Sequence, residues 1–266
     1  MDYYQAILLA LIQGVTEFLP ISSSGHLLLP AKFFGWPDQT LTFDVAVHIG
    51  SLLAVVIYLR KELKELFTAW IHSIFFRAWS VQSFLAWQLV IATIPAALCG
   101  WFFSEFIENN LREVVVIAAA TTFFGIILGV ADFWRKKSKT LEDLGWGDVF
   151  VIGVSQALAL IPGTSRSGIT MTSALFLGYS REDAARFSFL MSVPIISLSG
   201  MYKGSHLIVS QTIDWEPLIL GVFVSSISAY VCIYSFLRFI QKIGMLPFVI
   251  YRIFLGLILF MIAYLY

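Results

Sequence analysis

Charge is scarce in this sequence. Only 13% of its 266 residues are charged, whereas a soluble protein has about 25%. The formal net charge is zero, so the chain does not have the excess of basic residues that is typical of nucleic-acid-binding proteins. No nucleic-acid partner is therefore expected. Cysteine is also rare: Cys99 and Cys232 both lie inside apolar runs and are interpreted as small core residues. Neither a low-complexity tract nor a long linker divides the chain, so a single domain is expected.

Apolar residues dominate instead. They make up 59% of the chain, and the mean hydropathy is +0.84. A soluble domain is about 45–50% apolar, and a fold of this length could not bury the excess, so the bilayer must solvate much of the surface. Runs of about 20 apolar residues predict bilayer-spanning helices. Six such runs are present, at residues 41–60, 84–104, 112–134, 186–208, 217–238 and 246–266.

Two further hydrophobic regions are broken by polar loops. Residues 3–35 are interrupted at 20–26, the first loop, and residues 148–179 at 162–168, the second loop. Both loops are rich in Pro, Gly or Ser, which end helices. Each half is too short to span a bilayer, and irregular backbone at membrane depth is tolerated only inside protein or beside a wet cavity. Two re-entrant helix hairpins are therefore predicted.

The two broken regions resemble each other in sequence. Gln13 and Gln156 are 143 positions apart, and the same offset aligns Ser22 with Ser165 and Gly25 with Gly168. Three spans follow each hairpin, and because three crossings is an odd number, the second copy must be inverted. The predicted fold is an all-α polytopic membrane protein, with six full spans and two re-entrant hairpins arranged as an inverted repeat. Residues 1–266 form a single membrane domain, with repeat one at about 1–134 and repeat two at about 147–266.

Basic residues are distributed unequally over this layout. By the positive-inside rule the side that carries most of them is cytoplasmic, and both termini then lie outside. The other side carries Arg112 and Lys203, and Arg252 in the last run is expected to snorkel to the interface. The residues on the cytoplasmic side are Arg60, Lys61, Lys64, Arg77, Arg135, Lys136, Lys137, Lys139, Arg181, Arg186, Arg238 and Lys242.

The first loop carries candidate catalytic groups. Gln13 and Glu17 are four residues apart on one helix face, and Glu17 is a candidate general base or metal ligand, or a buried carboxylate satisfied by its neighbours. Ser22, Ser23 and His26 suit a helix N-terminus that attracts anions, or a nucleophile activated by His and Glu. An ordinary cap with a structural His is the alternative.

The second loop carries an arginine among hydroxyls. The stretch PGTSRSGIT places Arg166 between Ser165 and Ser167, with Thr170 one helical turn further on. Glycine allows close backbone approach, and a guanidinium suits bidentate phosphate contact. The GK[ST] pattern of a Walker loop is absent. The anion that Arg166 requires is either Glu17 or a substrate phosphate, and one site could include both.

Four residues are predicted to support these groups from nearby. Asp44 and His48 are four apart on one face of a predicted span, and their spacing favours a supporting role over catalysis. Gln13 shares a face with Glu17. Gln156 repeats Gln13 in the second hairpin and is expected to hydrogen-bond within the site.

The two motifs together resemble the undecaprenyl pyrophosphate phosphatase family of bacteria, the bacitracin-resistance type. That family carries a Glu-or-Gln, three residues, then Glu, followed by Ser-Ser-x-Gly-His and later Pro-Gly-x-Ser-Arg-Ser-x-x-Thr. Here these are Gln13 to Glu17, Ser22 to His26, and Pro162 to Thr170. The similarity extends over the full length, including FDVAVHIGSLLAV and PFVIYR. One departure is Gln13, because many members carry Glu at this position, which weakens any mechanism that needs two carboxylates.

The resemblance implies hydrolysis of undecaprenyl pyrophosphate to undecaprenyl phosphate and inorganic phosphate. This reaction recycles the carrier lipid for peptidoglycan and cell wall synthesis and confers resistance to bacitracin. The location implied is the bacterial inner membrane, and a homodimer is plausible. The implied catalytic residues are Glu17, Ser23, His26 and Arg166, and the implied phosphate ligands are Ser22, Ser165, Arg166, Ser167 and Thr170.

The resemblance also implies help from a divalent cation. Because the motif holds one certain carboxylate, we expect Mg²⁺ or Ca²⁺ to be held mainly by the pyrophosphate, with Glu17 as the best protein ligand. No organic cofactor is expected. Whether Ser23, His26 or a water is the nucleophile stays open, as does the side of substrate access. A lipid transporter is the main alternative function, and a membrane scaffold the weaker one.

Overall fold

The computed structural model describes residues 1–36, 40–134, 139–207 and 215–265, and regular structure there is helical apart from one isolated bridge, Lys139 to Tyr179. Two short 3₁₀ turns, Leu141–Asp143 and Leu158–Leu160, flank α7. The α-helices are α1 Tyr3–Phe18, α2 Ser23–Phe34, α3 Leu41–Tyr58, α4 Arg60–Phe75, α5 Val81–Asn110, α6 Val114–Trp134, α7 Trp146–Ala157, α8 Arg166–Phe176, α9 Arg181–Leu207, α10 Trp215–Ile243 and α11 Leu246–Leu265.

The six predicted spans are confirmed. Within the described residues, six helices are long and apolar enough to cross a membrane: α3, α5, α6, α9, α10 and α11. Helices α5 and α10 contain 30 and 29 residues and extend past the apolar runs from which they were predicted. At about 1.5 Å per residue, each is longer than the hydrocarbon core is thick, so their ends reach beyond it.

The two broken regions form two pairs of shorter helices. Helix α1 ends at Phe18 and α2 begins at Ser23, while α7 ends at Ala157 and α8 begins at Arg166. The α-helices are thus interrupted at 19–22 and 158–165, which overlaps the predicted breaks at 20–26 and 162–168, and each second helix begins earlier than predicted. Helix α4 was not predicted, because its charged residues interrupt the apolar run; Leu59 alone separates it from α3.

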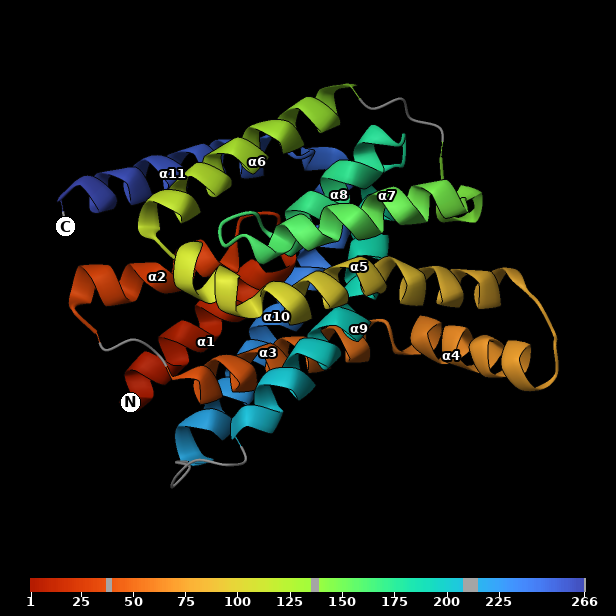
Figure 1. Ribbon diagram of the computed structural model, residues 1–266, viewed down its shortest axis with the longest axis horizontal. Helices are drawn as coiled ribbons and strands as arrows, with labels where there is room; N and C mark the ends of the chain where they lie inside the picture. The colour runs from red at the N-terminus through yellow and green to blue at the C-terminus, as the bar shows by residue number, and fades with distance from the viewer. Residues whose placement is uncertain (37–39, 135–138, 208–214, 266) are drawn as a thin grey trace.

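Helices distant in sequence pack together around the two loops. Helices α6 and α11 lie side by side, and α10 packs against both α1 and α3. Helix α5 contacts α7 and α9, while α8 lies against α6 and α9. Both termini lie at one end of the long axis, and the connection between α4 and α5 lies at the other (Figure 1).

Helix α10 approaches α1 and α3 closely because small residues line the contacts. A Cβ placed on Gly14 of α1 would lie 2.0 Å from Ser228 Oγ and 2.6 Å from the Ser225 carbonyl oxygen. A Cβ placed on Gly50 of α3 would lie 1.9 Å from Ser225 Oγ and 2.4 Å from the Val222 carbonyl oxygen. Small residues of this kind permit close helix packing in membranes, where dispersion contacts replace the hydrophobic effect.

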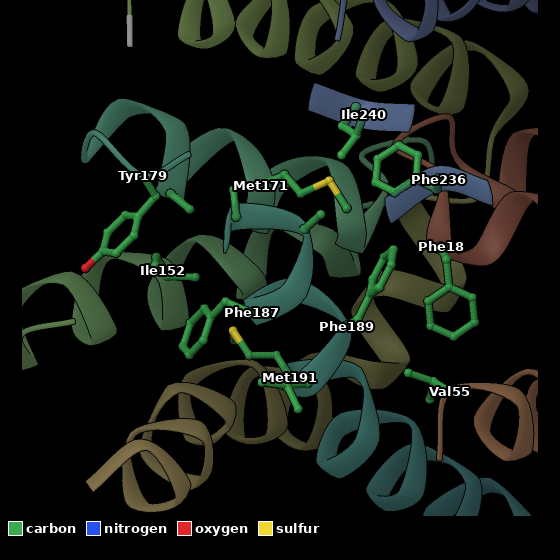
Figure 2. Packing of buried hydrophobic residues seen from close by; sticks show 14 of the residues in the cluster. Phe18, Val55, Ile152, Met171, Tyr179, Phe187, Phe189, Met191, Phe236 and Ile240 are labelled. Atoms are coloured by element: carbon green, nitrogen blue, oxygen red, sulfur yellow. The ribbon is translucent and has the colours of Figure 1, made fainter. Parts of the chain in front are cut away.

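An aromatic and methionine core lies beside the loops. Figure 2 shows the Phe189 side chain between those of Phe18 and Phe236, with Met171 and Met191 in the same cluster. The Phe18 and Phe189 rings meet edge to face with centroids 5.2 Å apart. Phe18 is fully buried and follows Glu17 directly, so this packing fixes the end of α1 that carries the carboxylate.

Substitution of Gly50 by Ala should separate α3 from α10. The added Cβ meets backbone, which cannot rotate away, so we expect a loss of about 1–3 kcal/mol in unfolding free energy. Gly200→Ala in α9 is the matched control, because a Cβ there meets nothing within 4 Å; it should raise stability by up to about 1 kcal/mol. Thermal unfolding of the purified proteins in detergent measures both. Equal midpoints for Gly50→Ala and wild type would contradict the packing described.

Candidate active site

The two loops share one backbone conformation. Ser22 and Ser165 have φ angles of 73° and 69°, which residues other than glycine rarely adopt. Each is the N-cap of the helix that follows, and its hydroxyl accepts a hydrogen bond from the N–H of Gly25 or Gly168. Such a conformation costs on the order of 1–3 kcal/mol and persists only where its surroundings impose it, as at ligand sites.

Reciprocal hydrogen bonds join the loops. Ser24 Oγ accepts from the Gly163 N–H at 3.0 Å, and Ser167 Oγ donates to the Leu19 carbonyl at 2.9 Å. The two loops therefore meet in one place.

Glu17 lies where the loops meet. Its Oε1 accepts a hydrogen bond from Arg166 Nη2 at 3.0 Å. Its Oε2 accepts from Gln13 Nε2 at 3.0 Å and from Ser23 Oγ at 3.2 Å. Only 9% of the Glu17 side chain is exposed. One carboxylate thus contacts a guanidinium through one oxygen and a hydroxyl through the other, as in charge-assisted networks.

Ser23 and Arg166 occupy equivalent positions. Each is the first residue of a helix, α2 and α8, and they are separated by the same 143 residues (166 − 23) that separate Ser22 from Ser165. Both side chains converge on Glu17 from different loops. The same backbone position therefore presents a hydroxyl in one loop and a cation in the other.

Helix α9 supports the guanidinium from the other side. Arg166 Nη1 donates to the Ser188 carbonyl at 3.1 Å, and the hydroxyl oxygens of Thr170 and Ser188 lie 2.8 Å apart in a hydrogen bond. The guanidinium also lies over the Phe18 ring, 5.9 Å from its centroid. Sequence reasoning missed Ser188, whose one available signal was a hydroxyl inside an apolar span.

His48 lies at the edge of this network. Its Nε2 is 3.9 Å from Glu17 Oε2, and 37% of its side chain is exposed. Its Nδ1–H donates to the Asp44 carbonyl oxygen at 2.7 Å, so Nε2 is the nitrogen that faces the carboxylate. The structure thus brings His48 to the site, with Asp44 orienting it through main chain.

His26 points elsewhere. Its Nδ1 lies 2.7 Å from the Ser22 carbonyl oxygen and its Nε2 lies 2.6 Å from the Tyr251 hydroxyl. A carbonyl only accepts, so Nδ1 carries the proton and Nε2 accepts from Tyr251. The two rings are stacked, with planes 2° apart. Sequence reasoning missed Tyr251, although it lies in the PFVIYR stretch.

The remaining hydroxyls of the predicted phosphate site have partners within the protein. Ser22 pairs with Ser24 and Ser165 with Ser167, each at 3.2 Å between oxygens. Thr170 also donates to the Arg166 carbonyl at 2.9 Å. To bind a phosphate, these hydroxyls must replace their hydrogen bonds within the protein by hydrogen bonds to the phosphate oxygens. Their role as phosphate ligands stays a prediction.

Gln156 does not make the contact that was expected of it. Its amide donates to the Ala92 carbonyl of α5 at 3.5 Å, whereas Gln13 donates to Glu17. The sequence match between the two glutamines therefore does not extend to their contacts, because α7 presents Gln156 to α5.

The sequence of residues 6–258 matches the family described as bacitracin resistance protein BacA. The chain belongs to this family. The undecaprenyl-diphosphatase of Teredinibacter turnerae is 54% identical over 261 residues, which cover 98% of this chain and 99% of that protein. That of Saccharophagus degradans is 54% identical over 264 residues, 99% of each chain. Undecaprenyl-diphosphatase 1 of Pseudoalteromonas translucida is 52% identical over 257 residues, covering 96% and 97%.

Arg252 corrects an expectation for this BacA-family chain. It was expected to snorkel to the interface, but its side chain is 0% exposed. Its guanidinium donates to the carbonyl oxygens of Thr121, Gly163 and Thr164 at 2.9–3.0 Å. The side chain points into the protein, where backbone carbonyls of α6 and the second loop satisfy it.

The donor set does not match a metal cage built from protein alone. Among the described residues, no group of three or more His, Cys, Asp or Glu side chains is placed to hold a metal ion. Divalent cations such as Mg²⁺ and Ca²⁺ take six or more oxygen ligands, and Glu17 already pairs with Arg166. Thr164 Oγ1 and Gln13 Oε1 are buried without a hydrogen-bond partner in the described chain, which is a common feature of ligand or water sites.

The contact between His26 and Tyr251 should be visible as an energetic coupling. Tyr251→Phe removes the donor to a buried ring nitrogen and should cost about 1–3 kcal/mol of unfolding free energy. In the His26→Ala background the same change should cost much less, with a coupling of about 0.5–3 kcal/mol. Unfolding of the four proteins in detergent gives this value. Ser23→Ala, which changes no contact of Tyr251, is the control partner, and additive effects for His26 and Tyr251 would contradict the bond.

Proposed function

We propose that this protein hydrolyses undecaprenyl pyrophosphate to undecaprenyl phosphate and inorganic phosphate. Its full-length relatives at 52–54% identity are named undecaprenyl-diphosphatases. The observation that carries the proposal is the position of Glu17 between the Ser23 hydroxyl and the Arg166 guanidinium. A base, a nucleophile and a phosphate-binding cation in one buried network are the groups that phosphoryl transfer requires.

Arg166 binds the terminal phosphate in this proposal. Its guanidinium is already directed at an anion, Glu17, and a pyrophosphate competes for or shares those N–H groups. Helices α2 and α8 begin at Ser23 and Arg166, and main-chain N–H groups in the first turn of a helix favour an anion there. These dipoles stabilise charge that develops on the transferred phosphoryl group.

Ser23 is the proposed nucleophile. Glu17 takes the proton from its hydroxyl, the oxygen bonds to the terminal phosphorus, and the bond from that phosphorus to the bridging oxygen breaks. Undecaprenyl phosphate leaves with the bridging oxygen. Water then attacks the phosphoserine, and inorganic phosphate leaves as Ser23 recovers its proton. Both ring nitrogens of His26 are engaged, by Ser22 and Tyr251, which favours Ser23 over His26 as the nucleophile.

The histidines have different parts in this proposal. His48 faces Glu17 and is partly exposed, so it can exchange protons between the carboxylate and water. His26 sets the conformation of the first loop through the Ser22 carbonyl. A divalent cation, Mg²⁺ or Ca²⁺, would be held mainly by pyrophosphate oxygens with Glu17 as its protein ligand, and no step is assigned to it.

An apolar hollow on the surface of the protein is the proposed site of the lipid tail. It has a volume of about 540 Å³ and lies between α3 and α10. Val45 and Ile49 of α3, the helix that carries His48, both line it. Its other lining residues include Thr42, Val222, Phe223 and Ser226.

We further propose that the protein lies in the bacterial inner membrane with both termini periplasmic. The unequal distribution of Lys and Arg supports this orientation. Equivalent helix pairs support two re-entrant hairpins in an inverted repeat: α1 packs on α10 as α7 packs on α5, and α3 packs on α10 as α9 packs on α5. Removal of the pyrophosphate form would confer bacitracin resistance. The homodimer stays a prediction.

Glu17 and Arg166 should have separable effects on the reaction. Glu17→Gln removes the base but leaves the guanidinium free for phosphate, so kcat for phosphate release should fall by about 10²–10⁴-fold with KM unchanged or lower. Arg166→Lys replaces a bidentate fork by a point charge, so KM should rise. Hydrolysis of radiolabelled substrate by pure protein in detergent measures both.

Two outcomes would contradict the proposed mechanism or the proposed hydrolytic activity. Near-normal kcat in Glu17→Gln would remove the base from the mechanism. Tight lipid binding by the wild-type protein without any phosphate release would favour a lipid carrier, the function that an inverted repeat with broken helices also suits.

Filling the hollow should affect only the long lipid. Ser226→Trp places a large ring between α3 and α10 and should raise KM for undecaprenyl pyrophosphate roughly tenfold, which corresponds to about 1.4 kcal/mol of lost contact. The KM for farnesyl pyrophosphate should stay the same, because its short tail leaves most of the hollow empty. Ile227→Trp, an exposed neighbour that does not line the hollow, is the matched control. Equal KM values for Ser226→Trp and Ile227→Trp would argue against the hollow as the tail site.

A further inference from the structure

Arg252 is a buried cation that no carboxylate balances within the described chain. It is the largest fully buried side chain there, and the hydrogen bonds found for its guanidinium all go to backbone carbonyls. Burying a charge without a counter-charge is costly in an apolar surrounding, so an arginine retained in this way is a candidate for function.

The carbonyl partners of Arg252 belong to three separate segments. Nη2 donates to Gly163 and Thr164 of the second loop at 3.0 and 2.9 Å. Nε donates to Thr121 of α6 at 3.0 Å, and Nη1 lies 3.5 Å from the carbonyl oxygen of Pro20 in the first loop. One guanidinium on α11 therefore connects both loops to α6.

Two glycines leave the space that this side chain fills. A Cβ on Gly125 of α6 would lie 2.9 Å from Arg252 Cβ, and a Cβ on Gly168 of α8 would lie 2.7 Å from Nη1. The side chain passes between these two helices before it reaches the loops. Its position is thus determined along its whole length rather than only at its tip.

The bonds from Arg252 also direct the N–H groups of the second loop. In a planar trans peptide the C=O and the following N–H point in opposite directions. Holding the Thr164 carbonyl toward Arg252 therefore turns the Ser165 N–H away from it, at the start of the helix that carries Arg166. The neighbouring Gly163 carbonyl accepts a second bond from Thr121 Oγ1 at 3.2 Å, which holds the same stretch in place.

We propose that Arg252 is a positioning residue for the phosphate site. It does not touch the reacting groups; it holds the Pro20 and Gly163–Thr164 backbones so that Ser23 and Arg166 converge on Glu17. This inference rests on the hydrolytic function proposed above. Lysine cannot replace arginine here, because a single ammonium with three donors does not reach carbonyls on three segments.

The test compares Arg252→Lys with Arg181→Lys in the purified full-length protein. Arg181 also joins helices, from α9 to Asp132 of α6 at 2.7 Å and to the Gln241 carbonyl of α10 at 3.5 Å, and neither partner belongs to the loops. Arg252→Lys should lower kcat for undecaprenyl pyrophosphate by about 10–100-fold with KM within roughly threefold, because a small misplacement of reacting groups lowers the rate without removing a binding contact. Arg181→Lys should lower the thermal midpoint but leave kcat unchanged.

A second comparison separates positioning from general stability. Methylguanidinium should restore part of the kcat of Arg252→Ala, whereas potassium at the same ionic strength should not. If Arg252→Lys fails to fold, Gly125→Ala replaces it, since the three atoms nearest to the added Cβ all belong to the Arg252 side chain. A kcat equal to wild type in the folded Arg252→Lys or Gly125→Ala protein would overturn the inference. Absence of phosphate release by the wild-type protein would instead overturn the proposed function.

Discussion

The ion pair between Glu17 and Arg166 is the interaction on which this site depends. A carboxylate or a guanidinium alone inside an apolar helical bundle would be strongly unfavourable, and each is acceptable here because the other lies 3.0 Å away. The two groups are on different loops, so their pairing requires both loops to enter the same part of the protein. The backbone conformation that Ser22 and Ser165 have in common, together with the hydrogen bonds between the loops, holds both loops in that place.

Repetition of one backbone design explains how so few polar residues build the site. The equivalent residues Ser23 and Arg166 begin α2 and α8 and meet at one carboxylate. Their neighbours on either side, the capping serines and the serines that join the loops, have the same tasks in both copies. Within these two three-residue stretches, 22–24 and 165–167, the chemical difference lies at the central position, where one loop has a hydroxyl and the other a cation.

Much of this arrangement was predictable because charge is rare and costly in an apolar chain. The six spans and the approximate positions of both helix breaks followed from that rule, and Glu17 was one of the two anions expected for Arg166. The contacts of Arg252, His26 and Gln156 did not follow from it, because periodicity indicates which residues share a helix face but not what that face meets. Arg252 near the start of an apolar span has the usual pattern of a snorkelling residue, and only Gly125 and Gly168, distant in sequence, leave room for it to turn inward.

The bonds between the loops also bear on how the chain assembles. Glu17 precedes its partner by 149 residues, so the ribosome completes α1 to α6 before Arg166 exists. Until then Glu17 lacks its guanidinium partner, and Ser24 of the first loop lacks the Gly163 N–H that it accepts from. Helix α1 also lacks α10, against which it packs. The first half of the protein is therefore an incomplete structure in the membrane, and the second half completes its fold and its catalytic groups in the same step.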